Sequence, residues 1–283
     1  MSQSRVNSNA KGTSPRQEPP QLEDRAPSKV RLNPGEIEYE LGVPIPGPIL
    51  PQDQWAKTAI HRLPEGELNV PELFQRVSPV VLDIGCGNGR FVVSSAVRRP
   101  DVDHIGIDIL PVVIRYATRR GKERGLSNTR FAVCGGSEFL AKHVQPGSLS
   151  EIHIYHPQPF HDPRERHLRL LTPEFLKLVH GSLANHGKLF LQSDSKAYWE
   201  YLVPCVSQLM DWTEQPGPWE EDLNGRSRRE LIATEKGFKI YRGFGQKKAT
   251  LTNDEVEALV QGMPLPSFRT ETTRRPFKKR GRR

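Results

Sequence analysis

Apolar runs of strand length alternate with amphipathic stretches along the middle of this chain. The alternation is typical of βαβ units, in which helices connect the strands of a parallel sheet. The pattern predicts strands at residues 80–84, 104–109, 129–133, 150–156 and 188–193. It predicts helices at residues 89–98, 112–124, 137–143, 173–184 and 196–210. Two further strands, expected as an antiparallel edge pair within 230–245 around Gly237, would complete a doubly wound, mostly parallel seven-stranded α/β sheet.

The ends of the chain differ in composition from this domain, which we place at residues 78–250. Residues 1–33 are polar and contain no aromatic side chain. They cannot bury enough apolar surface to offset the entropy of ordering, so they are expected to be a disordered tail. Residues 34–77 are expected to form an N-terminal extension that ends in a leading helix at 70–77. Residues 251–283 are expected to be a C-terminal extension with a disordered basic tail.

Neither a membrane segment nor a metal site is expected. No uncharged apolar run approaches the ~18–20 residues that span a bilayer, and the N-terminus lacks the apolar core of a signal peptide. The protein is therefore expected in the cytoplasm. Cys86, Cys134 and Cys205 show neither the paired spacing of a zinc site nor the density of a disulfide scaffold, so buried free thiols are expected. The sequence favours a monomer but leaves the oligomeric state open.

The net charge of +8 raises the question of a nucleic-acid partner, and the distribution of that charge bears on the answer. Residues 274–283 (RRPFKKRGRR) carry seven basic side chains and no acidic one, and residues 1–33 carry six basic and three acidic ones. The remaining chain therefore has no net positive charge. Any RNA-binding surface on the folded domain must be a local patch.

A glycine-rich turn follows the first predicted strand in the segment VLDIGCGNGR, with glycines at 85, 87 and 89. Glycine at alternate positions lets the backbone turn sharply and approach a ligand closely. Asp108 stands at the end of the second predicted strand, where a carboxylate can accept both ribose hydroxyls of an adenosine. The turn and this acid together predict a nucleoside-containing cofactor.

The spacing of the glycines favours S-adenosylmethionine over a dinucleotide. A pyrophosphate binder uses G-x-G-x-x-G, whereas this chain has G-x-G-x-G. Asp83, at the end of the first strand, would repel a diphosphate but suits a ligand with a cationic ammonium and sulfonium. The alternative is an ordinary turn of an α/β fold. The favoured interpretation is a Rossmann-like, class I S-adenosylmethionine-dependent methyltransferase fold.

Several motifs between about Leu68 and Lys247 resemble, in order, those of the bacterial tRNA (guanine-N7-)-methyltransferase family. ELNVPELFQRVSPVVLDIGCGNG is similar to the family's leading helix and glycine turn. IGIDI matches the second strand, and RGLSNTRFAV matches the connection into the third. The resemblance implies transfer of a methyl group from S-adenosylmethionine to N7 of a guanine in tRNA.

The segment after the fourth strand, HPQPFHDPRERHLRLLTPEF, resembles the family's P-D-P-W segment and the basic run that follows it. Gln158 stands where the family has Asp, Phe160 where it has Trp, and Asp162 where it has Lys. Gly135 occupies the position of the family's acid in the loop after the third strand. QSDSKAY and SRRE are similar to two further elements that line the substrate side in the family.

The resemblance extends the expected site beyond the glycine turn. The expected cofactor-binding residues are Asp83, Gly85, Gly87, Gly89, Asp108, Gly135 and Gln158. The expected substrate-binding residues are Phe160, Asp162, Arg164, Arg166, His167, Arg169, Asp194, Ser227 and Glu230. Gln158 and Asp194 are expected to be catalytic. A second group of basic residues would join the phosphate-binding patch: Arg226, Arg228 and Arg229.

The chemistry of guanine N7 limits what these residues must do. N7 is an unprotonated lone pair, so an in-line transfer needs alignment and no general base. Carboxylates near the acceptor can hold the guanine N1 and N2 donors and offset the charge that builds on the purine. Asp194 and Glu230 are candidates, whereas Gln158 can supply a hydrogen bond but no charge. Phe160 could stack on an exposed base or simply pack in the core.

Two other functions stay open at this point. The HPQPF segment loosely resembles the motif with which amine methyltransferases hold an exocyclic NH2 group, and the basic run 164–169 could be a solvated face. A non-catalytic RNA-binding relative is the third possibility. Such a protein would have no physical need for Asp83, Asp108 and the glycines.

Removal of residues 274–283 is expected to lower tRNA affinity and flatten its salt dependence, because the tail would act by releasing counterions from phosphates. If about three of its basic groups engage the RNA, the slope of log K against log salt should fall by roughly 2–3 units. Titrations of full-length and shortened protein at several salt concentrations measure this. Equal slopes would instead favour a ribosome-associating or solubility role for the tail. Affinity for S-adenosylmethionine serves as the control and should not change.

Overall fold

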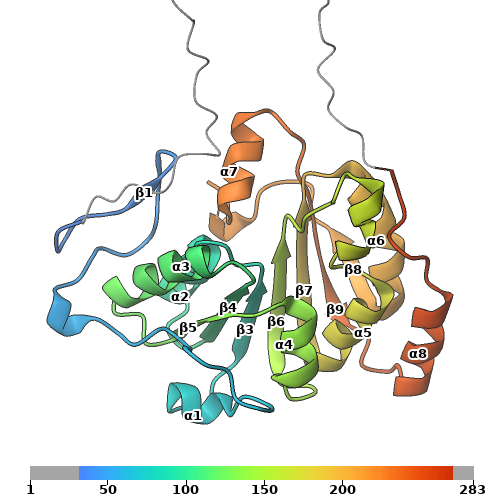
Figure 1. The fold of residues 1–283 in the computed structure, drawn as a ribbon, viewed down its shortest axis with the longest axis horizontal. Helices are drawn as coiled ribbons and strands as arrows, with labels where there is room; N and C mark the ends of the chain where they lie inside the picture. Colours follow the sequence, from blue (N-terminus) through green and yellow to red (C-terminus); the bar gives the residue numbers. More distant parts are fainter. Residues whose placement is uncertain (1–31, 223, 270–283) are drawn as a thin grey trace, which may run out of the picture. The chain divides into compact units, whose positions relative to one another are not determined.

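The computed structural model describes residues 32–222 and 224–269, which contain a seven-stranded sheet in the order β5-β4-β3-β6-β7-β9-β8 (Figure 1). The first five strands are parallel: β3 (Val80–Ile84), β4 (Asp103–Asp108), β5 (Thr129–Val133), β6 (Leu149–Tyr155) and β7 (Leu183–Ser193). β9 (Tyr241–Lys247) is antiparallel to β7 on one side and to β8 (Met210–Glu214) on the other. The expected seven-stranded, mostly parallel sheet is confirmed.

Helices cover both faces of the sheet, and the alternation of side chains along each strand explains why. Val81 of β3 packs with Phe91 of α2 (Arg90–Arg98) and with α3 (Pro111–Glu123). Leu82 faces the opposite way, into a core shared with α4 (Gly136–Lys142), α5 (Pro173–Ser182) and α6 (Lys196–Leu209). Every residue of β3 is buried, as a strand covered on both faces requires. The predicted doubly wound arrangement is therefore correct.

Of the two strands predicted within 230–245, the second is present as β9, but the first is wrong. Residues Arg228–Glu235 form the helix α7, and the partner of β9 is β8, from a segment expected to end a helix and begin a loop. A short apolar run such as LIA fits a buried helix turn as well as a strand. Ser227 caps the helix by accepting from the Glu230 amide, and Gly237, with φ of 72°, follows its end.

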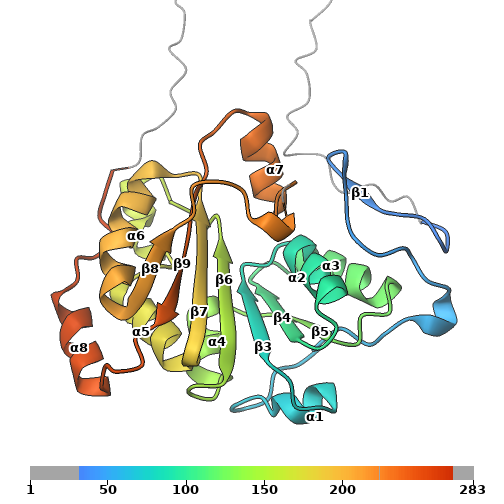
Figure 2. The same cartoon turned by 180° about the vertical axis from the view of Figure 1, so that it is seen from behind.

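The extensions at both ends of the domain pack against it. The N-terminal one forms the two-stranded hairpin β1 (Tyr39–Glu40) and β2 (Val43–Pro44), then the leading helix α1 (Val70–Phe74). α1 is shorter than predicted because Gln75 turns left-handed, with φ of 56°. The C-terminal extension contains an additional helix, α8 (Asn253–Gly262), which lies beside α5 (Figure 2). A capping box between Thr252 and Glu255 begins it.

Short 3-10 turns complete the described chain: η2 (Gln52–Gln54), η3 (Pro163–Leu168) and η4 (Glu220–Asp222). All three cysteines are buried and free, as predicted. The tail predicted at 274–283 lies outside the described residues, as does all of the N-terminal tail except its last two residues. Within 32–222 and 224–269, no helix is long and apolar enough to cross a bilayer, and no cluster of potential metal ligands is found.

Candidate active site

The glycine turn after β3 forms an open cradle at the carboxyl end of the sheet. Gly85 and Gly87 have φ of 76° and 53°, and a Cβ added to either would meet no atom within 4 Å. The amides of Gly85 and Cys86 donate to the carbonyl of Ile107 at 2.8 and 2.9 Å, which fixes the turn against the end of β4. The exposed backbone therefore suits a ligand that must approach closely.

Asp108 lies beside this cradle with its carboxylate held in place. Its Oδ2 accepts from the Gly87 amide at 3.1 Å and its Oδ1 from the Leu110 amide at 2.9 Å. The side chain is partly exposed, so lone pairs remain for ribose hydroxyls. Ile109 and Val133 next to it are 69% and 45% exposed, which leaves apolar surface for a flat base. These residues fit the nucleoside part of S-adenosylmethionine.

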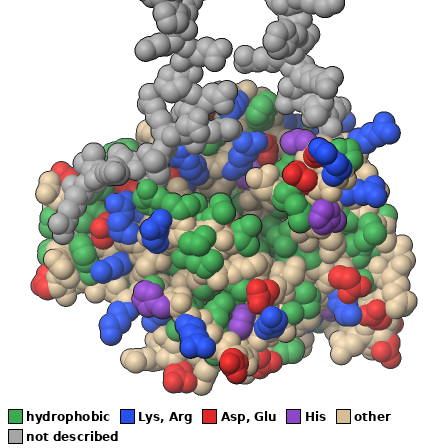
Figure 3. Space-filling view, viewed as in Figure 1, with side chains coloured by type: hydrophobic (Ala, Val, Ile, Leu, Met, Phe, Trp, Pro, Cys, Tyr) green, Lys and Arg blue, Asp and Glu red, His purple; other side chains and the backbone are tan. Residues whose placement is uncertain are grey.

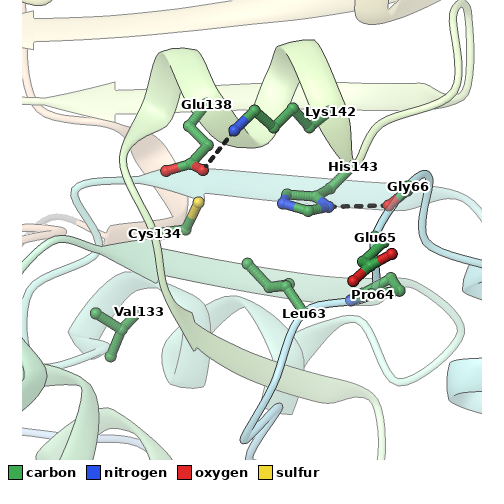
Figure 4. A pocket seen from close by; sticks show the side chains of 9 residues that line it. All are labelled: Leu63, Pro64, Glu65, Gly66, Val133, Cys134, Glu138, Lys142 and His143. Atoms are coloured by element: carbon green, nitrogen blue, oxygen red, sulfur yellow. Dashed lines mark hydrogen bonds and ion pairs between the residues drawn. The ribbon is translucent and has the colours of Figure 1, made fainter.

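A cavity of about 560 Å³ opens next to this edge, between α4 and the loop that precedes α1 (Figure 4). Val133 and Cys134 at the end of β5 contribute to its wall, and the Cys134 amide donates to the Asp108 carbonyl at 3.0 Å. Gly135 begins α4 here. Figure 4 shows Glu138 and Lys142 of α4 paired on one side of the cavity. The cavity thus adjoins the nucleoside side of the cradle.

Asp83 provides a buried carboxyl group under the same turn. Asp83 is only 2% exposed. Burial, together with the nearby charge of Asp108, raises the pKa of Asp83 to about 8, although Arg226 opposes the rise. A cationic group placed here would lower that pKa again. The environment therefore favours a ligand that carries an ammonium or sulfonium group.

The acceptor side of the edge begins where β6 ends. The His156 amide donates to the Gln192 carbonyl at 2.7 Å, which keeps the segment 156–160 alongside the end of β7. His156 and Phe160 both have positive φ, 52° and 43°. Left-handed backbone at non-glycine residues is uncommon and tends to occur at functional sites. The prolines between them keep this segment out of regular structure.

A chain of hydrogen bonds determines which ring nitrogen of His156 carries the proton. The Trp219 indole N–H can only donate, and it donates to Gln192 Oε1 at 2.8 Å. The Gln192 amide nitrogen therefore donates to His156 Nε2 at 2.9 Å. His156 must then carry its proton on Nδ1, from which it donates to Asp194 Oδ1 at 2.9 Å. The ring is a fixed donor to the Asp194 carboxylate.

Asp194 is the carboxylate that this chain orients. Burial raises its pKa, but the hydrogen bond from His156 and the ion pair with Arg229, at 2.7 Å, outweigh burial and leave the pKa well below its usual range. Its side chain stays 15% exposed. Asp194 therefore presents a negative charge at the acceptor edge throughout the physiological pH range.

The other residues expected on the acceptor side differ in their exposure and in their hydrogen-bond partners. Gln158 is exposed and Phe160 half-buried on the 156–160 segment. Glu230 is buried and engaged by Arg242 Nη2 at 2.6 Å and by the Arg226 amide at 2.7 Å. Its carboxylate therefore holds the start of α7 in place. Ser227, the cap of α7, likewise serves the fold.

The basic run on η3 divides into exposed and buried members. Arg166 and His167 are exposed, and Arg164 is exposed but paired with Asp162 at 2.6 Å. Arg169 is buried, and its guanidinium donates to four backbone carbonyls: Pro159, Phe160, Pro266 and Phe268. Arg169 therefore supports the acceptor segment instead of reaching solvent. Figure 3 shows basic side chains spread over one face with acidic ones between them.

Arg226 was expected beside these basic residues but is also buried. It donates to the Tyr155 hydroxyl at 2.7 Å and pairs with Asp222 and Glu221 at 3.1 and 2.8 Å. Arg229, by contrast, reaches Asp194, and Arg228 reaches the N-terminal hairpin at Glu40. The three neighbouring arginines thus contact three different parts of the protein.

The fold and the cradle together define a class of protein. A doubly wound sheet whose antiparallel strand β9 lies between β7 and β8, with a glycine turn after β3, is the architecture of Rossmann-like S-adenosylmethionine-dependent methyltransferases. Among solved structures, the 16S rRNA methyltransferase KamB resembles this chain with a TM-score of 0.50 at 16% identity, covering 68% of this chain and 98% of that one. This likeness concerns the fold alone.

Comparisons of sequence identify the family. The family described as "Putative methyltransferase" matches residues 77–248. The tRNA (guanine-N(7)-)-methyltransferase of Alkalilimnicola ehrlichii is 27% identical over 198 residues, which cover 69% of this chain and 84% of that protein. The enzyme of the same name from Saccharophagus degradans is 30% identical over 155 residues, covering 55% of this chain and 68% of that protein. The chain belongs to the tRNA (guanine-N(7)-)-methyltransferase family.

Sequence reasoning missed several residues of this site. Gln192 opens the QSDSKAY segment but had no predicted role there, and Trp219 and Glu40 lie outside any motif. The roles of all three come from partners far away in the chain. His156 offered one signal, because it stands directly before the Pro-x-Pro segment. Its pairing with Asp194 could not be derived from that position.

Affinity for S-adenosylmethionine is expected to rise with pH between about 5 and 6.5, at least about one unit below the range in which the cofactor's own amino group titrates. Asp83, with a pKa of about 8, is protonated there, and a cationic ligand favours its carboxylate. Binding should therefore release a proton and strengthen by at most about ten-fold per pH unit. Calorimetry in buffers of different ionisation enthalpy measures both quantities.

Asp83→Asn is the matched control, because it keeps the shape of the side chain and removes the titrating proton. Its affinity should vary much less over the same pH range. A wild-type protein that binds without proton release and with constant affinity would show that Asp83 is already ionised.

Proposed function

We propose that this protein transfers the methyl group of S-adenosylmethionine to N7 of a guanine in tRNA. Membership of the tRNA (guanine-N(7)-)-methyltransferase family supports the reaction and the substrate class. The observation that carries the proposal is the oriented, ionised carboxylate of Asp194 beside the acceptor segment 156–160. Asp194 would place a negative charge beside the guanine ring, which becomes positively charged as N7 is methylated.

The cofactor half of the site would bind and orient S-adenosylmethionine. S-adenosylmethionine supplies a methyl group on a positively charged sulfur. The glycine turn and Asp108 would hold its nucleoside part, and Asp83 would face its cationic part. Because all of these groups lie at one end of β3 and β4, the reactive sulfur would sit beside the end of β6, where the acceptor segment begins.

The acceptor half needs no general base, and the geometry agrees with that. His156 begins the acceptor segment, but its Nε2 already accepts from Gln192 and its Nδ1–H points at Asp194. It cannot take a proton from a substrate in this arrangement. Guanine N7 attacks with a free lone pair, so alignment and charge stabilisation suffice.

The remaining acceptor residues would position the base and its backbone. We propose that Asp194 holds the donor edge of the guanine, that the Gln158 amide adds a hydrogen bond, and that Phe160 stacks on the ring. Arg166 and His167, exposed on η3, would contact phosphates. Arg164 can join them if its ion pair with Asp162 opens. Arg229, on α7, pairs with Asp194.

The reaction product is the direct test of this function. Unmodified tRNA incubated with the purified protein and isotopically labelled S-adenosylmethionine should yield labelled N7-methylguanosine after digestion to nucleosides and mass spectrometry. Asp108→Ala, which removes the ribose acceptor, should abolish most of the signal. Label in an N-methylated exocyclic amine would favour the second substrate class suggested by HPQPF. No label in any nucleoside would favour a binding protein.

Asp194→Asn is expected to slow methyl transfer by roughly ten- to hundred-fold with little change in tRNA affinity. The amide keeps the shape and the hydrogen bond to His156, but it cannot balance the charge that develops on the purine in the transition state. Single-turnover rates at saturating S-adenosylmethionine isolate this step. Asp211→Asn, at an exposed carboxylate of β8, is the control. A transfer rate equal to that of the wild type would remove Asp194 from the mechanism.

A further inference from the structure

The N-terminal hairpin β1–β2 lies outside the segment that matches the family, residues 77–248, yet it packs against the start of α2 and against α3 (Figure 1). It carries two acidic residues, Glu38 and Glu40, which are 9% and 4% exposed. Buried carboxylates are costly unless they are paired. Both meet arginines of the domain, but they do so in different places.

Glu40 reaches the glycine turn itself. Its Oε1 accepts from the side-chain amide of Asn88, the residue between Gly87 and Gly89. The same oxygen lies 3.4 Å from Arg120 Nη2 of α3 and 3.5 Å from Arg228 Nη1 of α7. Its Oε2 lies 3.7 Å from Nη1 of Arg90, the first residue of α2. One side chain thus joins the turn to the helices around it.

Besides the backbone bonds to Ile107, side chains hold the turn. Asp108 accepts from the Gly87 amide, and Glu40 accepts from the Asn88 side chain. The Asn88 carbonyl in turn accepts from Arg120 Nη1 at 3.1 Å. A segment with three glycines loses much conformational entropy when it is ordered, so an anchor that orders it before the ligand arrives lowers the cost of binding.

We propose that Glu40 is a positioning residue for S-adenosylmethionine: through Asn88 it holds the glycine turn in the conformation that receives the cofactor. The hairpin would then support the cofactor site indirectly, through the Asn88 side chain. This inference concerns cofactor binding alone and does not depend on which RNA is methylated.

Glu38 provides a matched control on the same hairpin. Its carboxylate pairs with Arg120 at 2.9 Å, with Arg124 at 3.2 Å and with Arg119 at 3.6 Å. All three arginines belong to α3 or its C-terminal cap. Glu38 therefore attaches the hairpin to α3 and its cap, and among the described residues it forms no ion pair with the glycine turn.

Measured affinity for S-adenosylmethionine should distinguish the role of Glu40 from that of Glu38. Calorimetry on the full chain without RNA should show at least a five-fold higher Kd for Glu40→Ala, which removes the acceptor for the Asn88 amide, and a Kd within two-fold of wild type for Glu38→Ala. Both variants should lower the Tm, since each leaves buried arginines with fewer partners. In the cofactor-free protein, backbone amides of residues 86–90 should exchange faster with deuterium in Glu40→Ala but not in Glu38→Ala.

Asn88→Ala keeps the test decisive if Glu40→Ala fails to fold, because it breaks the link to the turn while every ion pair remains. It should weaken cofactor binding to a similar extent, and the double variant should be no weaker than either single one. Three results would overturn the proposal: a folded Glu40→Ala with wild-type affinity, equal losses in Glu38→Ala, or effects of Asn88→Ala and Glu40→Ala that simply add. Because no RNA is present, failure to methylate tRNA leaves this outcome unaffected.

Discussion

The register of the parallel strands is the constraint on which the rest of the site depends. β3, β4, β6 and β7 run in one direction, so their carboxyl ends meet at a single edge of the sheet. That edge brings together Asp83, Asp108, His156 and Asp194. Because these strands are covered by helices on both faces, the register cannot slip without moving core side chains out of place. The core therefore fixes the spacing between cofactor and acceptor.

Two carboxyl groups at this edge have opposite pKa shifts, and the reason is the number of partners each has. Burial and the charge of Asp108 raise the pKa of Asp83, with only Arg226 opposing them. Asp194 is also partly buried, but His156 and Arg229 more than offset that effect and lower its pKa. One group is thus poised to respond to a cationic ligand, and the other carries a permanent charge. Carboxyl groups whose environments separate their pKa values commonly have separate roles.

Arginine has several uses in this chain that its sequence context does not distinguish. Arg169 and Arg226 occur in basic runs that suggest phosphate binding, yet both are buried and hold loops in place. A guanidinium has five donors in a rigid plane, which suits it to satisfy several backbone carbonyls or carboxylates at once. Around Glu40, Arg90 and Arg120 serve the glycine turn in a similar way. The surface available to RNA is correspondingly smaller than the basic composition suggests.

The sequence alone determined the features that are local: the alternation that builds the doubly wound sheet, the glycines whose positive φ shapes the turn, and the acids that end β3 and β4. Each depends on residues close together in the chain. The helix α7 was misjudged because a short apolar run fits either structure until packing selects one. Only the tertiary structure decided the partners of His156, Gln192 and Glu40 and the C-terminal partners of Arg169. These partners lie tens of residues away, and hydrogen bonds at that separation leave no periodic signal in the sequence.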